Sequence, residues 1–248
     1  LSSVFMTVTL SLHRQVDIDI SMCGRMAITL PPEAMAQLFN ATPANDLPPV
    51  PNYNVCPTVN IHTVTSDSGT RHLRAMRWGF LPRWYKKLTG GPLLINARSE
   101  TIAEKPAFRE ACRHRRCLIP ADGFYEWERK EGEKPIPYRA VREDGQPMAM
   151  AGVWQEWEVD GNRITSCAIV TTDANAKMAE IHHRLPVILG PNEWPLWLGE
   201  AGKGAAILMR PVADDVLDLQ RVSSAINSNR ATGPELWNVI EKEVDQTE

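Results

Sequence analysis

Several features that would place a chain in a special class are absent from these 248 residues. No apolar run approaches the roughly 18–20 residues that a membrane-spanning helix needs, so we expect no membrane partner. A generally basic surface is also lacking, because the formal net charge is −3. Any nucleic-acid site must therefore be a local patch.

Cysteine is sparse, and its spacing argues against two further classes of protein. The five cysteines are Cys23, Cys56, Cys112, Cys117 and Cys167, an odd number without the spacing of a disulfide framework. This usage is typical of a reducing compartment, and we expect a cytoplasmic protein. The spacing of Cys112 and Cys117 suggests half of a zinc site, but no second ligand pair follows, so no metal site is predicted.

Alternating apolar patterns predict a strand-rich chain with helices between hairpins. Two hairpins are expected, one pairing Ile61–Thr65 with His72–Trp78 and one pairing Met148–Glu158 with Arg163–Thr171. Further strands are predicted at Arg25–Leu30, Cys117–Pro120, Gly123–Trp127, Ile207–Met209 and Val222–Ser224, and residues 42–60 are predicted to be an irregular loop. Helices are predicted at Pro31–Phe39, Pro106–His114, Ala174–Ile181, Pro191–Leu198 and Glu235–Glu243. Without repeats or linkers, these elements indicate a single α+β domain.

The domain is expected to span residues 22–240. Residues 1–21 form an N-terminal extension that lacks the basic region and cleavage site of a secretory signal, and residues 241–248 form an acidic tail.

The segment Met22-Cys23-Gly24-Arg25 carries the clearest chemistry. A cysteine that becomes the first residue bears an α-amine with a pKa of about 7.7–8.0 beside a thiol with a pKa of about 8.5. Such an aminothiol condenses with an aldehyde, first to a Schiff base and then to a thiazolidine ring. In this chain residues 1–21 precede the segment, so the amine has to be exposed first. The alternative is that Cys23 is a buried structural cysteine.

Asn96 and Arg98 project to the same side if they leave a strand together. An amide beside a guanidinium fork suits a phosphate and a neighbouring polar group, although an ordinary strand end with a surface arginine is the alternative.

A carboxylate among aromatic residues at 123–127 is a candidate acid–base, because burial raises a carboxyl pKa. Strand alternation alone does not choose between Glu126 and Glu128. Similarly, either His182 or His183 could serve as a proton shuttle. Adjacent histidines without a third-ligand spacing do not predict a metal site.

Arginine and tryptophan are interleaved in one run of the chain, at Arg71, Arg74, Arg77, Trp78, Arg83 and Trp84, and arginines recur at 109–116. Cations for phosphates and aromatic rings for bases suit a single-strand binder, whereas a solvated charged face is the alternative.

Seven motifs in register resemble the SRAP (SOS response-associated peptidase) family, whose members capture abasic sites in single-stranded DNA. They are Met22-Cys23-Gly24-Arg25, Tyr53-Asn54 with Cys56-Pro57-Thr58, Arg77-Trp78-Gly79-Phe80-Leu81-Pro82, Asn96-Ala97-Arg98-Ser99-Glu100, Arg116-Cys117-Leu118-Ile119-Pro120 with Trp127, Ala151-Gly152-Val153-Trp154, and His182-His183-Arg184-Leu185-Pro186. The resemblance covers about residues 22–230 and implies a mainly antiparallel, bifurcated sheet or small barrel flanked by helices. It departs from the family where Cys56 replaces the usual alanine, where Leu185 replaces methionine, and in the extension.

The resemblance also implies a role for each residue. Cys23 is the nucleophile toward the abasic-site aldehyde, Asn96 holds the sugar or amine, Glu126 rather than Glu128 is the acid–base, and His182 assists sugar ring opening. The DNA-binding residues implied are Arg25 and Arg98, which bind phosphates, together with Arg77 and Trp78. Residues Trp78 to Pro82 are implied to lie near the junction where stacked bases are parted. No metal or organic cofactor is implied, and we expect a monomer in the bacterial cytoplasm or nucleoid.

Three functions follow as hypotheses. The first is covalent capture of abasic single-stranded DNA, with lyase character and with autoproteolysis as one route to a free Cys23. The second is a thiol peptidase that acts on its own N-terminus or on other peptides. The third is a single-strand binding module without covalent chemistry.

Overall fold

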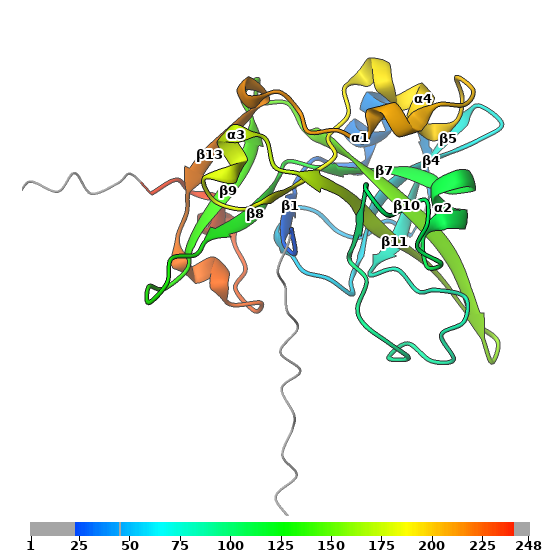
Figure 1. Ribbon diagram of the computed structural model, residues 1–248, viewed down its shortest axis with the longest axis horizontal. Helices are drawn as coiled ribbons and strands as arrows, with labels where there is room; N and C mark the ends of the chain where they lie inside the picture. Colours follow the sequence, from blue (N-terminus) through cyan, green and yellow to red (C-terminus); the bar gives the residue numbers. More distant parts are fainter. Residues whose placement is uncertain (1–22, 45, 241–248) are drawn as a thin grey trace, which may run out of the picture.

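The computed structural model describes residues 23–44 and 46–240 (Figure 1). The predicted extension 1–21 and acidic tail 241–248 lie outside the described residues. Two β-sheets form the body of the protein, and short helices lie on its periphery (Figure 1). The predicted α+β class, mainly antiparallel with a small barrel, is confirmed.

The larger sheet closes into a five-stranded barrel. Its strands are β4 (Asn60–Asp67), β5 (Thr70–Trp78), β7 (Arg116–Ala121), β10 (Met148–Val159) and β11 (Asn162–Asp173). The hairpins β4–β5 and β10–β11 confirm the two predicted pairs, and β7 joins them. A parallel pairing of β11 with β5, Ser166 opposite Arg77 and Cys167 opposite Trp78, completes the ring.

Three short strands extend the barrel sheet. β2 (Ala41–Pro43) pairs with β5, and both β6 (Asn96–Arg98) and β12 (Arg184–Pro186) pair with β11. Thr171 of β11 therefore lies between Arg98 of β6 and Pro186 of β12.

The smaller sheet has the strand order β13–β9–β8–β1–β3. Its strands are β1 (Met26–Ile28), β3 (Asn52–Val55), β8 (Gly123–Glu128), β9 (Ile136–Arg142) and β13 (Leu217–Arg221). Although β7 and β8 are separated only by Asp122, they belong to different sheets. The corner is fixed because the Asp122 carboxylate accepts a hydrogen bond from the backbone of Thr29, and its own N–H donates to the carbonyl of Ala27 at 2.9 Å.

Most of the helices lie beside the barrel, whereas the third in chain order lies beside the smaller sheet (Figure 1). They are α1 (Pro32–Phe39), α2 (Arg109–His114), α3 (Ala176–Ala179) and α4 (Trp194–Leu198). Helix α1 starts with proline in its first turn, where no backbone donor is lost, and packs Phe39 against Trp194 of α4 at a ring distance of 4.5 Å. Trp197 of α4 is fully buried, and its indole N–H donates to the carbonyl of Cys117 at 2.9 Å. Among the described residues, no helix is long and apolar enough to cross a membrane.

Predictions failed for several short elements and for β9, a strand of seven residues. The expected loop 42–60 contains β2 and β3, and β9 and β12 were not predicted. The expected strand Ile207–Met209 is mostly a 3₁₀ helix, Ala205–Leu208, and the strand expected at 222–224 lies earlier, as β13. The helix expected at 235–243 is one 3₁₀ turn, Pro234–Trp237, and its last three residues lie outside the described range. Elements this short depend on tertiary pairing rather than on local periodicity.

Candidate active site

Cys23 and Glu126 meet at the start of the smaller sheet. Cys23 precedes β1, and the antiparallel register of β1 on β8, with Met26 opposite Phe124, brings it to Glu126. The backbone N–H of Cys23 donates a hydrogen bond to the Glu126 carboxylate. Both residues are buried, at 2% and 4% exposure, and Cys23 has a φ of 30°, which is uncommon for a residue other than glycine. A buried carboxylate and an unusual backbone at one position are typical of a functional site.

The environment of Cys23 keeps its thiol protonated. Burial raises the thiol pKa well above its usual value, and the negative charge of Glu126 and a hydrogen bond to it raise the pKa further. The positive charge of Arg184 acts in the opposite direction. The sulfur therefore needs a proton acceptor when it reacts, and the neighbouring carboxylate can provide one.

His182 lies near the same oxygen of the Glu126 carboxylate that accepts from the Cys23 nitrogen. Its Nδ1 is 4.0 Å from the Oε1 of Glu126, and the backbone N–H of Arg184 lies 3.1 Å from this nitrogen and donates to it. The sequence left Glu126 and Glu128 as alternatives. The geometry favours Glu126, because Glu128 forms an ion pair with Lys130 at 2.9 Å.

Ion pairs that the buried Arg184 forms beside His182 were not predicted. Arg184, 5% exposed, donates two hydrogen bonds to the carboxylate of Glu100 at 2.9 Å each and one to Asp173 at 2.6 Å. A further bond reaches the carbonyl of Thr171 at 2.9 Å. Hydrogen bonding to Arg184 is the main reason why the pKa of Glu100 is lowered. Both residues lie in motifs of the family resemblance, but no sequence rule pairs charges so far apart along the chain.

Asn96 and Arg98 lie on β6, on the barrel sheet. Asn96 is paired with Ile169 and Arg98 with Thr171, so β6 follows one edge of β11 while β12, which begins two residues after His182, follows the other. Arg98 is exposed. Its positive charge helps to lower the pKa of His183, after burial and the charges of His182 and Arg184. The structure thus brings Cys23 and His182 to the same carboxylate of Glu126. It also places Arg98 close enough to lower the pKa of His183.

Arg25 is held by an internal network. Its guanidinium donates to the Oδ1 of Asn54 at 2.6 Å, to the carbonyl of Ile226 at 2.8 Å and to the Oδ1 of Asn229. It also lies over the ring of Trp127, 5.7 Å from the centroid. Sequence reasoning missed this part, which depends on residues 226–231 returning to the start of the domain. Phosphate binding by Arg25 remains a prediction.

The expectation that Trp78 contacts DNA is wrong in this structure. Trp78 is fully buried in the barrel core, and its indole N–H donates to the carbonyl of Ile95 at 3.1 Å, so no face of the ring is open to a base. The neighbouring Arg77 is half-buried and donates to the carbonyl of Gly79 at 2.5 Å. Within the part of the chain that the structure describes, no three His, Cys, Asp or Glu residues are grouped to hold a metal ion.

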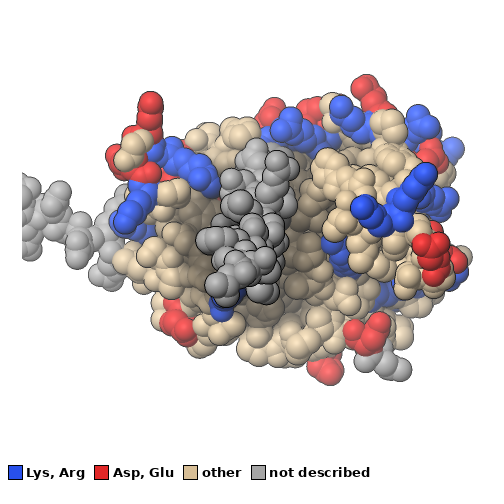
Figure 2. All heavy atoms as spheres, turned by 90° about the horizontal axis from the view of Figure 1, so that it is seen from below, with Lys and Arg blue, Asp and Glu red and all other residues tan. Residues whose placement is uncertain are grey.

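The face of the molecule seen in Figure 2 is hollowed between two lobes. Strand β1 begins toward the lower side in Figure 1, and Figure 2 looks at that side. Lys and Arg side chains stand on the lobes to either side of the hollow (Figure 2). Fold and site together define a class of protein, a barrel-and-sheet α+β domain with a cysteine, a glutamate and a histidine at the entry of its first strand.

Comparison with known proteins assigns the family. The chain belongs to the family described as SOS response associated peptidase (SRAP), whose profile matches residues 22–229. It is 36% identical over 222 residues to abasic site processing protein YoqW of Bacillus subtilis, covering 87% of this chain and 98% of that protein. Identity is 32% over 223 residues to abasic site processing protein YedK of Escherichia coli, with the same two coverages.

Vertebrate and solved relatives extend the comparison. The chain is 30% identical over 265 residues to abasic site processing protein HMCES of Xenopus tropicalis, covering 88% of this chain and 78% of that protein. A crystal structure from Bordetella bronchiseptica, 27% identical, matches with a TM-score of 0.68 over 81% of this chain and all of that one. Another from Bacteroides thetaiotaomicron, 24% identical, matches the fold with a TM-score of 0.78 over 88% of this chain and all of that one.

Proposed function

We propose that this protein binds abasic sites in single-stranded DNA and joins them covalently through the amine and thiol of Cys23. The observation that carries the proposal is the hydrogen bond from the Cys23 nitrogen to the buried carboxylate of Glu126. A free amine at this position would have its proton acceptor already in place. The names of the relatives, all abasic site processing proteins, support the same substrate.

Glu126 would accept and return the protons while the thiazolidine ring forms. The amine of Cys23, deprotonated by Glu126, adds to the C1′ aldehyde of the ring-opened sugar, and the resulting carbinolamine loses water to give an imine. The sulfur then adds to the imine carbon, and the thiol proton passes by way of Glu126 to the ring nitrogen. One C=O bond is replaced by a C–N and a C–S bond, and one water leaves. Since the pKa of the thiol is raised, sulfur adds second, as a thiol that needs this proton acceptor.

His182 would be the acid–base that acts on the sugar. Ring opening of the abasic sugar requires a proton to leave the C1′ hydroxyl and another to reach the ring oxygen. The Nδ1 of His182 accepts the hydrogen bond of the Arg184 backbone and lies 4.0 Å from Glu126, so the other ring nitrogen would exchange protons with the sugar during these steps and during reversal. Arg98, exposed on β6, would bind an adjacent phosphate, and Asn96 on the same strand would hold the sugar.

A peptidase activity toward the Met22–Cys23 bond is the second candidate. With Met22 in place the nitrogen of Cys23 is an amide, which cannot form an imine. Glu126 contacts this nitrogen, which is the leaving group when the bond is hydrolysed. The same carboxyl could therefore protonate it, and cleavage would produce the amine that capture requires.

The test uses an abasic oligonucleotide and a version of the chain that begins at Cys23. We expect an adduct that survives denaturation with the parent protein and with Cys56→Ala, a second, half-exposed thiol that serves as control. We expect none with Cys23→Ala and a rate lower by about 10²–10⁴ with Glu126→Gln. An adduct that persists in Cys23→Ala would refute the proposal. Mass analysis of the full chain, in which Glu126→Gln should retain residues 1–22, tests the peptidase step.

A further inference from the structure

A pocket of about 650 Å³ lies between the smaller sheet and the residues that follow helix α3. Its walls come from the end of β8, from β9 and β13, and from residues 239–240. The last two residues run beside β13, where the N–H of Ile240 donates to the carbonyl of Arg221 at 2.9 Å. Apolar side chains and one tyrosine form much of the lining: Ile136, Tyr138, Ile181, Leu219, Val239 and Ile240.

The charged side chains around this pocket balance one another. Glu128 and Glu180 are acidic, whereas Lys130 and Arg221 are basic, and Lys130 is already paired with Glu128 at 2.9 Å. A pocket without net charge is poorly suited to a nucleic-acid strand, because such strands are bound through cations that neutralise their phosphates. The aliphatic lining instead favours the apolar side chains of a peptide.

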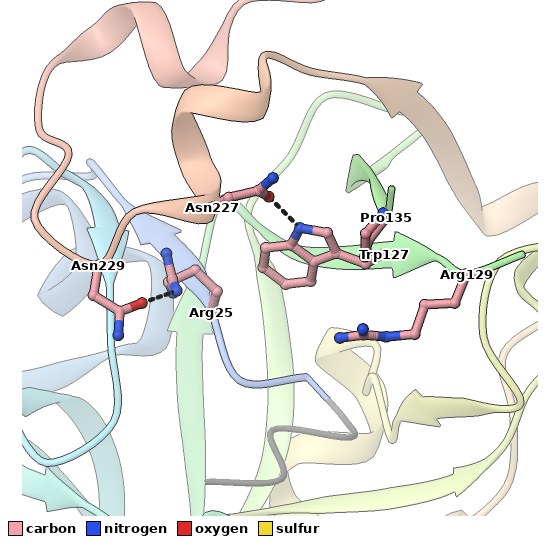
Figure 3. A pocket seen from close by; sticks show the side chains of 6 residues that line it. All are labelled: Arg25, Trp127, Arg129, Pro135, Asn227 and Asn229. Carbon is pink, nitrogen blue, oxygen red and sulfur yellow. Dashed lines mark hydrogen bonds between the residues drawn. The ribbon is translucent and has the colours of Figure 1, made fainter. Parts of the chain in front are cut away.

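The pocket lies on the same face of the smaller sheet as the carboxylate of Glu126. Residues directly opposite each other on antiparallel strands share a face. Glu126 of β8 is opposite Tyr138 of β9, and Tyr138 is opposite Arg221 of β13. Trp127, the next residue on β8, lies on the other face and lines a different pocket (Figure 3). A peptide held beside Glu126 therefore has this pocket next to it.

The chain that precedes Cys23 is attached on this face. The nitrogen of Cys23, to which Met22 is joined, donates to the Glu126 carboxylate. Strands β8, β9 and β13 are neighbours, so the distance from β8 to β13 is about 10 Å. Three extended residues also span about 10 Å. The residues from Ile20 toward Val16 are therefore within reach of the pocket.

The sequence before Cys23 has the pattern that this pocket requires. Apolar and polar side chains alternate in the stretch Val16-Asp17-Ile18-Asp19-Ile20-Ser21-Met22. In an extended chain, this alternation gives one apolar side and one polar side. The apolar side can pack on the aliphatic lining while the acidic side stays in water.

We infer that the pocket binds the apolar side chains of residues 16–20 of this chain while Met22 is still joined to Cys23. This binding holds the Met22–Cys23 bond beside Glu126. The inference rests on the peptidase activity in the proposed function and adds how its substrate is recognised. The substrate class is an extended segment in which apolar and acidic residues alternate.

Photocrosslinking in the full chain tests the contact directly. The chain carries Glu126→Gln, which keeps an acceptor for the Cys23 nitrogen and leaves residues 1–22 attached. The photoreactive residue p-benzoylphenylalanine replaces either Ile18 or Asp19. We expect the probe at position 18 to crosslink to the pocket lining, including Val239 and Ile240, and the probe at position 19 not to do so. Crosslinks from position 18 to other parts of the chain or to a second copy, or equal crosslinking from both positions, would overturn the inference.

The rate at which residues 1–22 are released gives a second test. Val239 and Ile240 are 47% and 43% exposed, so replacing both with serine changes surface side chains. This double variant should release the segment roughly 10- to 100-fold more slowly than the parent, as expected for two partly buried aliphatic contacts. The control Ile207→Ser, at a position that is 71% exposed and outside the pocket, should not change the rate.

The two tests separate the inference from the peptidase proposal. An unchanged release rate in the Val239→Ser, Ile240→Ser variant would overturn the inference even if the parent cleaves itself. If the parent releases nothing, the peptidase proposal alone fails, and the crosslinks from position 18 still decide whether the pocket binds the segment.

Discussion

Glu100→Gln tests whether the ion pair between Arg184 and Glu100 organises the active site. The substitution keeps the size of the side chain and one hydrogen-bond acceptor, but it removes the charge that Arg184 contacts through two bonds of 2.9 Å. Arg184 remains buried with Asp173 and the carbonyl of Thr171 as its other partners. His182 receives its hydrogen bond from the backbone of Arg184, so a displaced Arg184 would also displace the imidazole.

The expected loss of stability in Glu100→Gln depends on how far the Glu100 side chain is exposed to water. Hydrogen bonds to a charged group contribute about 1.5–3 kcal/mol when desolvated. The side chain of Glu100 is 44% exposed, so water competes for it and we expect a loss of about 1 kcal/mol, equivalent to about 2–4 °C in Tm. The side chain of Asp173 is 81% exposed, and Asp173→Asn should therefore cost less than about 0.5 kcal/mol.

The pH dependence gives a sharper test. The pKa of Glu100 is lowered in the folded protein, so its contribution is complete above the unfolded pKa of about 4.3 and disappears as the pH falls through the folded pKa. Urea unfolding of the parent and of Glu100→Gln should thus differ at pH 7 and converge below pH 4. The adduct-forming rate of the variant should also fall at pH 7. Equal losses in Glu100→Gln and Asp173→Asn, or a difference that does not change with pH, would refute this reasoning.

Two further predictions concern buried positions. Burial lowers the pKa of His62, which is 1% exposed on β4, to about 4. As the pH falls, the unfolded chain therefore binds a proton at this histidine at a higher pH than the folded chain does. Stability should fall between about pH 6.5 and 4, by up to about 1.4 kcal/mol per unit, and His62→Phe should flatten this slope in urea titrations; an unchanged slope would contradict it. In Gly123→Ala the added Cβ would lie 2.4 Å from the carbonyl oxygen of Ala140, so chemical denaturation should show a stability loss of at least about 1–3 kcal/mol. In the control Gly190→Ala the nearest atom is 3.7 Å away, and the stability should change by less than about 0.5 kcal/mol. Similar losses in the two variants would exclude the clash.

Apolar alternation and a helix-start signal were enough to predict the long hairpins and the first helix. The hairpins β4–β5 and β10–β11 are long and alternate clearly, and helix α1 carries its proline at the start, so all three were predicted. Closure of the barrel could not be predicted, because the parallel pairing of β11 with β5 joins Ser166 to Arg77, far apart along the chain. Likewise, no pattern shows that β7 and β8 enter different sheets at Asp122.

The site divides in the same way. Residue chemistry singled out Cys23 but left Glu126 equal to Glu128, and the register of β1 on β8 is what brings Glu126 to the Cys23 nitrogen. Trp78 was misassigned because a tryptophan beside arginines has the same sequence signature whether it lies on the surface or in the core. The bonds of Arg184 to Glu100 and of Arg25 to Asn229 join distant segments, and only the folded chain shows them.

The mass of the protein–DNA product tests the central claim most directly. The chain beginning at Cys23 is incubated with an abasic oligonucleotide, denatured, treated with borohydride and iodoacetamide, and weighed intact. Thiazolidine formation predicts the sum of the two masses less one water, plus one carbamidomethyl group on each of Cys56, Cys112, Cys117 and Cys167. No hydrogen is added by borohydride, and Cys23 is protected from alkylation. A product equal to the full sum, a reducible imine, or an alkylated Cys23 within the adduct would contradict the claim.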